Sequence, residues 1–542
     1  MRLYDWMAKH ISRLGVKQCF ALLGDANMQL AARLDEEGIS FTYVRHEHCA
    51  VAASMAYARK TGQVGFSTVT CGPGLTQLMT ALPAAVRARI PIVVLAGESP
   101  VGKRWYNQHI DQAPFVEATG ARYIALRDKQ VVIQGLEEAF VMAVRDQIPV
   151  VVGVPFDVQR VEMADPPPSY QVKLSALAHQ KRAARPECVS ALANLINSSQ
   201  RIAIIAGLGA SEPSAVDVCR QLAEKIDALL FTTLPARGLF SEDPYYLGIS
   251  GGFSSDVSRK YLNESDLILA IGCSLASHNS DGGTLWPNAR VAQVSEEPQG
   301  IFQGRVVAQT LVQGDAGLTV SELIPLVDEK PVLRRSERLL REIEETPIDS
   351  QTTVDVAGGI HPFDAVAILD QQIPKDWQLV NSSGHCSYFF SHMKTRPFKN
   401  FLTIREFGAI GNGISFAMGV ARAEPQVPTV LFDGDGSVLM HIQELETIQR
   451  HQLPVIIVVF NDGGYGSEFH KLRAEGLGES GAYFGATDLA SIAAGFGLHG
   501  IQVESEDELR AALEFLISEP QPALIDVRVS PKVGSPLMRK AH

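Results

Sequence analysis

The sequence predicts an α/β protein built from three parallel-sheet domains. Short apolar runs rich in β-branched residues alternate with helical segments along most of the chain. That alternation is typical of parallel sheets that are covered by helices on both faces. Two stretches without periodicity divide the 542 residues into three parts. A chain of this length is expected to hold about three domains.

The first predicted domain spans residues 1–165. Its expected strands are four apolar runs separated by helical segments: FTYV (41–44), GFSTVT (65–70), IPIVVLAG (90–97) and IPVVVGVP (148–155). The stretch 164–186 contains three consecutive prolines and little periodicity, so we expect a linker there.

The second predicted domain spans residues 187–330 and has a Rossmann-like pattern. RIAIIAGLGAS (201–211) predicts a strand, a glycine turn and a helix, and further strands are expected at 229–234, 266–272 and 290–295. The G-x-G turn lacks a third glycine, because position 212 is Glu. We therefore favour a structural layer without a ligand. The charged stretch 334–347 predicts a surface helix that leads into a second linker.

The third predicted domain spans residues 355–542 and contains the most informative segment of the chain. One strand ends in Gly434-Asp435-Gly436, a helix is expected to begin near Ser437, and a second strand ends in Asn461-Asp462-Gly463-Gly464. Both carboxylates then lie at the same edge of a parallel sheet. Such a pair can hold Mg²⁺, which prefers oxygen ligands and often shares them with phosphate. Glycines and a helix N-terminus favour bound phosphate at this edge.

Composition and charge exclude several classes of protein. The net charge of −12 argues against a surface for nucleic acid or anionic membrane. Seven scattered cysteines without a C-x-x-C pair are typical of a reduced, cytoplasmic protein. The N-terminus has helical rather than signal-peptide character, and no apolar run is long enough to span a membrane.

Three linked motifs resemble thiamine diphosphate enzymes. They are the segment 433–466, YVRHEHCAVAASMAYARKTG (43–62) and TVTCGPGLTQ (68–77). In their content, spacing and order along the chain, these motifs are similar to those of the group that contains acetolactate synthases, 2-oxo acid decarboxylases and benzaldehyde lyase-like enzymes. The resemblance covers essentially the whole chain. It implies thiamine diphosphate and Mg²⁺ as cofactors, with a pyrimidine-binding first domain and a diphosphate-binding third domain.

Glu47 is the strongest catalytic candidate that the resemblance implies. The matching Glu contacts N1′ of the aminopyrimidine ring, and a partly desolvated carboxyl group can share a proton there. Glu47 could instead only stabilise the start of its helix. In EFGAIGNG (406–413), Gly408 would accept from the 4′-amino group and Ile410 would support the bent cofactor.

The cofactor's diphosphate and metal would lie at the third sheet. The resemblance assigns phosphate contacts to His385, and Ser383 and Gly384 can donate as well. The turn around Asp435 adds the remaining phosphate-binding candidates, Gly434, Gly436 and Ser437. The metal ligands would be Asp435, Asp462 and the carbonyl of Gly464. Many relatives have Asn at the position of Asp462.

The sequence leaves the reaction open. Asp25 and Glu468 match proton-relay acids of pyruvate decarboxylase-like enzymes, which would release an aldehyde. Gln108 matches a Gln of the carboligases, and the neighbouring His109 could be an acid/base. Each of these four polar residues could also be purely structural. Arg87 and Arg473 are the candidates for binding a substrate carboxylate.

The leading hypothesis is a lyase or carboligase that acts on 2-oxo acids or ketones, with or without an aldehyde acceptor. The alternatives are a flavin-carrying oxidase of the same fold and a catalytically silent cofactor-binding paralogue. The resemblance implies a homodimer, or a tetramer built from dimers, with Glu47 and Asp435 of one site supplied by different chains. The segment VGSPLMRKAH (533–542) is a candidate lid by position.

Overall fold

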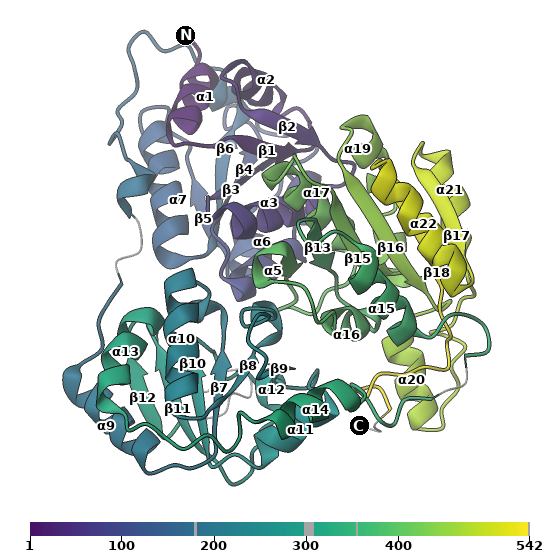
Figure 1. Cartoon of the computed structure of the whole chain (residues 1–542). Helices are drawn as coiled ribbons and strands as arrows, with labels where there is room; N and C mark the ends of the chain where they lie inside the picture. Colours follow the sequence, from purple (N-terminus) through teal and green to yellow (C-terminus); the bar gives the residue numbers. More distant parts are fainter. Residues whose placement is uncertain (178–180, 298–307, 354–355, 540–542) are drawn as a thin grey trace.

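Three lobes, each built on a six-stranded sheet, make up the molecule (Figure 1). The computed structural model describes residues 1–177, 181–297, 308–353 and 356–539. All strand pairs of the three sheets are parallel. The predicted α/β class with three parallel sheets is therefore confirmed.

The first sheet contains the four predicted strands and two more. Its order is β2-β1-β3-β4-β6-β5. The strands are β1 (Gln18–Ala21), β2 (Ser40–Tyr43), β3 (Gly65–Val69), β4 (Ile92–Glu98), β5 (Arg122–Ala125) and β6 (Pro149–Pro155). The helices are α1 (Leu3–Arg13), α2 (Met28–Glu36), α3 (Glu47–Thr61), α4 (Pro73–Thr76), α5 (Ala81–Ala88), α6 (Ala113–Ala118), α7 (Val132–Asp146) and α8 (Phe156–Gln159). The edge strand β5 has no fully buried residue, so it lacks the apolar run of the predicted strands.

The third sheet repeats the strand order of the first. Its order is β14-β13-β15-β16-β18-β17. The strands are β13 (Gln378–Asn381), β14 (Phe401–Thr403), β15 (Thr429–Gly434), β16 (Val455–Asn461), β17 (His499–Val503) and β18 (Ala523–Arg528). The helices are α15 (Pro362–Gln372), α16 (Cys386–Ser391), α17 (Gly413–Ala423), α18 (Asp435–Met440), α19 (Glu444–Arg450), α20 (Gly466–Ala474), α21 (Leu489–Gly495) and α22 (Glu506–Ser518). Because β15 and β16 are parallel neighbours, the residues that follow them share one edge of the sheet.

The helix expected after the Gly434-Asp435-Gly436 turn differs from the prediction. It begins at Asp435 rather than near Ser437, and it is divided into α18 and α19. His441 leaves the helical conformation, with φ −133° and ψ 39°. Its Nδ1 lies 2.8 Å from the carbonyl oxygen of Gly411, so a tertiary hydrogen bond accompanies the break.

The central sheet has the doubly wound order β12-β11-β10-β7-β8-β9. Its strands are β7 (Ile202–Ala206), β8 (Leu229–Thr232), β9 (Tyr246–Ile249), β10 (Leu267–Ile271), β11 (Arg290–Ser295) and β12 (Thr310–Gln313). Its helices are α9 (Pro186–Asn197), α10 (Pro213–Lys225), α11 (Asp256–Asn263), α12 (Ser277–Ser280) and α13 (Ala316–Leu323), and α14 (Glu337–Glu345) follows. A Cβ on Gly207 or Gly209 would meet the backbone of Gly272, so these glycines allow two turns to pack closely.

The linker expected at 164–186 contains a single helical turn, Leu174–Leu177, before α9 begins at Pro186. That count refers only to the part of this stretch that the structure describes. The helix expected within 334–347 is α14.

The first and third domains share one hydrophobic core. A single cluster of buried residues includes Ala53 on α3, Ala417 on α17 and Ile457 on β16. The helices α3 and α17 lie side by side between the first and third sheets (Figure 1). A Cβ on Gly419 would overlap the carbonyl oxygen of Ala53, so the two helix backbones lie in direct contact.

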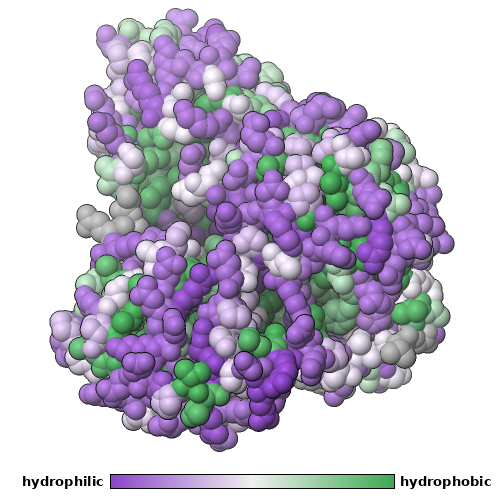
Figure 2. Space-filling view, viewed as in Figure 1, coloured by the Kyte–Doolittle hydropathy of each residue, from purple (hydrophilic) through white to green (hydrophobic). Residues whose placement is uncertain are grey.

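The face in Figure 2 is mostly hydrophilic, and its hydrophobic residues form separate small groups. Across the described ranges, no helix is both long and apolar enough to cross a membrane.

Candidate functional site

Two carboxylates and a carbonyl converge where β15 and β16 end. Asp435 opens α18, and its Oδ2 accepts a hydrogen bond of 3.1 Å from the backbone N–H of Gly463. The Gly464 carbonyl oxygen lies 3.7 Å from the position that a Cβ of Gly436 would occupy. The structure therefore brings the predicted ligands Asp435, Asp462 and Gly464 to one place.

Asp462, not Asn461, faces this place. The Asn461 amide donates to the Thr487 carbonyl at 2.9 Å and to Asp526 Oδ1 at 2.8 Å, so it holds the turn together. Asn461 is also almost fully buried. The neighbouring Asp462 carboxylate is left pointing toward Asp435 and His385.

The electrostatics of the pair fit a bound divalent cation. Burial raises the pKa of both Asp435 and Asp462, and the negative charge of Asp462 raises that of Asp435 further. Two desolvated carboxylates of like charge are unfavourable unless a cation neutralises them. Among the described residues, no group of three or more His, Cys, Asp or Glu side chains could hold a metal. Two carboxylates and one carbonyl would leave other positions to water and phosphate oxygens, as is usual for Mg²⁺.

The predicted phosphate-contacting residues surround the carboxylate pair. Gly411 N donates to Ser437 Oγ at 2.9 Å, and Ser383 Oγ donates to the Gly408 carbonyl at 3.5 Å. A Cβ on Gly384 would lie 3.9 Å from the side chain of Ile410. These contacts place the loop after β13 against the segment 408–411 and the start of α18.

Gly408 and Gly434 leave open space beside this group. Gly408 has φ +72°, and a Cβ there would meet nothing within 4 Å. A Cβ on Gly434 would meet the Cys386 sulfur at 3.4 Å and no other atom nearer than 4.0 Å. The arrangement fits a diphosphate that lies against backbone N–H groups.

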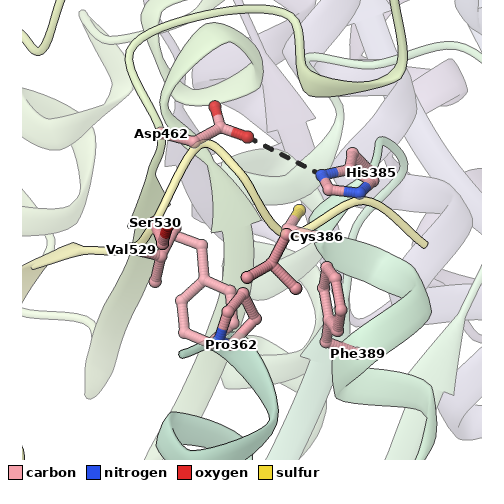
Figure 3. A pocket seen from close by; sticks show the side chains of 9 residues that line it. Pro362, His385, Cys386, Phe389, Asp462, Val529 and Ser530 are labelled. Carbon is pink, nitrogen blue, oxygen red and sulfur yellow. Dashed lines mark ion pairs between the residues drawn. The ribbon is translucent and has the colours of Figure 1, made fainter. Parts of the chain in front are cut away.

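His385 is buried beneath the C-terminal segment (Figure 3). Its Nε2 accepts from Ser535 N at 3.0 Å, which leaves Nδ1 to carry the proton toward Asp462 Oδ2, 3.6 Å away. Burial lowers the pKa of His385 to about 3, so the ring stays neutral. Both ring nitrogens therefore face protein atoms, and the described part of the candidate lid lies directly over this His.

Glu47 begins α3, as the sequence predicts. Its carboxyl group is half-buried, and desolvation raises its pKa. A Cβ on Gly74 would lie 3.5 Å from Glu47 Oε1. The next residue, His48, lies 2.5 Å through its Nε2 from Asn412 Oδ1, so the start of α3 touches the third domain of the same chain.

The turn before Glu47 is held by residues that sequence reasoning missed. We call Glu444, Glu446, Arg450 and His451 the α19 clamp. The Arg45 backbone N–H donates to both oxygens of Glu444, at 3.0 and 3.2 Å, and Tyr43 N donates to His451 Nε2 at 2.9 Å. Arg450 donates to the Tyr43 carbonyl, and Arg45 pairs with Glu446. Glu444 is 0% exposed. A sequence signal for this was present, because Glu444 lies on the same face of the helix as the buried residues Leu445 and Ile448.

Three predicted polar residues gather on the first domain alone. Tyr106 OH donates to Asp25 Oδ2 at 3.1 Å, Ser99 Oγ lies 2.6 Å from His109 Nδ1, and Cys71 Sγ lies 3.5 Å from Gln108 Oε1. In the described part of the chain, the hydrogen-bond partners of Asp25, Gln108 and His109 all belong to this domain. The structure of one chain therefore does not bring these residues to Asp435.

Glu468 lies on the third domain, apart from that cluster. It is exposed in the first turn of α20. The predicted decarboxylase pair Asp25 and Glu468 is thus not assembled within one chain.

Three family models match successive parts of the chain. They describe the N-terminal TPP binding domain (residues 1–115), the central domain (189–323) and the C-terminal TPP binding domain (382–527) of thiamine pyrophosphate enzymes. All predicted site residues fall within the first and third of these matches.

Curated relatives match along nearly the full length. The chain is 28% identical over 536 residues to the acetolactate synthase large subunit of Parasynechococcus marenigrum, covering 96% of this chain and 86% of that protein. It is 28% identical over 554 residues to acetolactate synthase 1, chloroplastic, of Oryza sativa subsp. japonica, covering 97% and 84%. It is 26% identical over 540 residues to the acetolactate synthase isozyme 2 large subunit of Escherichia coli K12, covering 97% and 95%.

Proposed function

We propose, because this chain belongs to the thiamine diphosphate-dependent enzymes of the acetolactate synthase family, that it transfers an acyl group from a 2-oxo acid to a second carbonyl compound. The donor's carboxylate would leave as CO₂, and the product would be a hydroxyketone or an acetohydroxy acid. The observation that carries the proposal is the convergence of Asp435, Asp462 and the Gly464 carbonyl beside the open backbone of Gly408 and Gly434.

The chain's own residues would act as follows. Thiamine diphosphate, when bound, would supply the nucleophilic carbon that this chemistry requires. Glu47 would hold a proton at N1′ of the pyrimidine ring, which its raised pKa favours. Gly408 would accept from the 4′-amino group, and Ile410 would fix the bend between the two rings. Ser383 and Gly384 would line the diphosphate with the turn Gly434–Ser437. His385, whose ring nitrogens face Ser535 and Asp462, would support this loop and the metal ligand Asp462 rather than the phosphate.

Mg²⁺ would neutralise the carboxylate pair. Asp435, Asp462 and Gly464 would supply three of its oxygen ligands. Asp462 brings a second negative charge to the metal, so we expect tighter metal binding than an Asn at this position would give.

We further propose that the enzyme is a homodimer, or a dimer of dimers, with sites shared between chains. Exposed hydrophobic side chains follow strands at the carboxyl edge of both outer sheets. Trp105, after β4, is 78% exposed. The others are Leu23, Val101 and Phe115 in the first domain and Met440, Tyr465, Tyr483 and Phe484 in the third. Pairing two chains would cover them and bring Gln108 and His109 to a partner's third domain.

The reaction is tested by product analysis. Purified protein with thiamine diphosphate and Mg²⁺ is incubated with a panel of 2-oxo acids, with and without aldehyde acceptors, and products are identified by NMR. Hydroxyketone or acetohydroxy acid is expected. Aldehyde and CO₂ alone would replace the proposal with a decarboxylase that uses Asp25 and Glu468 as proton donors. Bound cofactor without any product would favour a silent paralogue, and a yellow, flavin-containing protein would favour the oxidase.

The shared site is tested by mixing two inactive variants. Glu47→Gln and Asp435→Asn chains, mixed under conditions that exchange subunits, should recover part of the activity. One of the two sites in each mixed dimer would then have both native residues. Proven exchange without recovery would mean that each site is built within one chain.

A further inference from the structure

Arg405 is a half-buried cation whose guanidinium forms no ion pair with any described residue, although the Glu406 carboxylate accepts from its backbone N–H at 2.9 Å. It follows β14, its guanidinium lies 4.9 Å from the ring centre of Phe253 in the central domain, and it donates a hydrogen bond to Ser387 Oγ. Within the described ranges, no carboxylate lies within salt-bridge distance of this guanidinium. Desolvation lowers the pKa of Arg405 to about 10, because its surroundings disfavour the charged form of the side chain.

Three other desolvated arginines in the chain are engaged differently, whereas Arg422, like Arg405, has one hydroxyl partner. Arg396 pairs with Asp370 and donates to four backbone carbonyls. Arg237 donates to the carbonyls of Met393 and Arg396, and Arg334 to those of Ile202 and Tyr261. Arg405 has one hydroxyl acceptor in place of these carbonyls. A buried charge with so few partners is costly unless an anion completes its surroundings.

The position of Arg405 connects it with the proposed site. It lies three residues before Gly408, and its partner Ser387 lies in the first turn of α16, just after the loop that contains Ser383 and His385. Phe253 covers the flat face of the guanidinium, and Nη1 is used by Ser387. Among the described residues, the edge formed by Nε and Nη2 has no hydrogen-bond acceptor, and its two N–H groups match the two oxygens of a carboxylate.

We propose that Arg405 binds the carboxylate of the 2-oxo acid donor. This inference rests on the proposed function and names the residue that binds the carboxylate of the donor. The arginines that the sequence singled out fit this role less well. Arg473 is paired with Glu479 and also donates to the Pro531 carbonyl, and Arg87 is exposed on α5 with its guanidinium over Phe407.

Oxamate, an unreactive carboxylate mimic of pyruvate, tests the assignment without turnover. Calorimetry would compare its binding to the thiamine diphosphate- and Mg²⁺-loaded wild type with Arg405→Gln, Arg405→Lys and Arg422→Gln. Arg422 is the matched control, because it is also desolvated and has one hydroxyl partner, Thr42. Losing a charged hydrogen bond should weaken oxamate binding about 10- to 150-fold in Arg405→Gln and leave Arg422→Gln near the wild type. Arg405→Lys should lie between them.

A second arm separates the two possible anions. Titration of thiamine diphosphate into each apoprotein measures its Kd. An unchanged Kd supports a donor carboxylate, and a comparable loss in cofactor affinity would assign Arg405 to the diphosphate and overturn the proposal. Kinetics with 2,3-butanedione, a donor without a carboxylate, should be preserved in Arg405→Gln while kcat/KM for pyruvate falls.

The outcomes also distinguish the inference from the proposed function. If the wild type converts 2-oxo acids and binds oxamate, but Arg405→Gln binds oxamate equally well, only the role of Arg405 is wrong. If the wild type neither binds oxamate nor converts any 2-oxo acid, both are wrong. Should Arg405→Gln fail to fold, Arg405→Lys keeps the charge and carries the comparison.

Discussion

His48 should make the junction of the first and third domains sensitive to acid. The ring is 4% exposed, is stacked on His441 at 4.8 Å between ring centres, and contacts Asn412. Burial, together with the positive charges that His441 and His46 can carry, lowers its pKa from 6.5 to about 4. The difference corresponds to about 3 kcal/mol of folding free energy.

The sign follows from the depressed pKa. The unfolded chain binds a proton at His48 near pH 6.5, and the folded chain resists it until about pH 4. This stabilising contribution is therefore complete above pH 6.5 and is lost as the pH falls from 6.5 toward 4. A His48→Gln variant can still hydrogen-bond to Asn412 but cannot be protonated, so it should lose about 3 kcal/mol less than the wild type over this window.

Urea unfolding at several pH values between about 7.5 and about 4.5 measures this difference. The variant with exposed His499→Gln serves as the control, because its side chain lies in solvent. Equal losses of stability in the wild type and His48→Gln across the window would refute the reasoning. A loss of stability over this pH range that occurs in His499→Gln but not in the wild type would refute it as well.

Three further changes have definite expected results. Gly419→Ala forces a Cβ into the Ala53 carbonyl and should destabilise the chain by about 1–3 kcal/mol, measured by urea unfolding; wild-type stability would mean that the two helices separate at no cost. Arg396→Ala leaves the Asp370 carboxylate without its buried partner and should cost about 3–5 kcal/mol, and adding Asp370→Asn should recover part of that. Asp435→Asn should abolish the rise in melting temperature that Mg²⁺ and thiamine diphosphate give the wild type. The apoprotein of this variant should be no less stable than the wild-type apoprotein at neutral pH, because the raised pKa of Asp435 means that ionising its carboxyl group destabilises the fold. A full rise in that variant would place the metal elsewhere.

Local patterns were enough to predict most of the architecture. The runs before Asp435 and Asp462 are long, apolar and bounded by glycine, and they form the neighbouring strands β15 and β16. Parallel pairing alone then brings the two carboxylates to one edge. Of the two strands of the first sheet that were not predicted, β5 has no fully buried residue and therefore no apolar run, whereas β1 is fully buried and was simply missed. The break after α18 is accompanied by a hydrogen bond between His441 and Gly411, two residues far apart in the sequence, which local sequence does not encode.

The parts of the site that the sequence did not reveal depend on contacts between distant segments. Glu444 looks like an ordinary helix residue until the turn at Arg45 packs on it. Arg405 looks like a surface cation until Phe253 of the central domain covers it. Spacing within one segment can indicate that Glu444 is buried, but it does not identify the partner of either residue, because each partner lies in another domain.

The core that the first and third domains share limits how the chain can be cut. The central domain has its own hydrophobic clusters, drawn almost entirely from residues between Ala184 and Ile343. The helix α3, in contrast, packs on β1, β3 and α5 of its own domain with one face and against α17 of the third domain with another. A protease that cleaves the 164–186 linker should therefore leave two fragments that remain associated through size-exclusion chromatography. A first-domain fragment expressed alone would expose that apolar helix face and should aggregate, unless the remainder of the chain is produced with it.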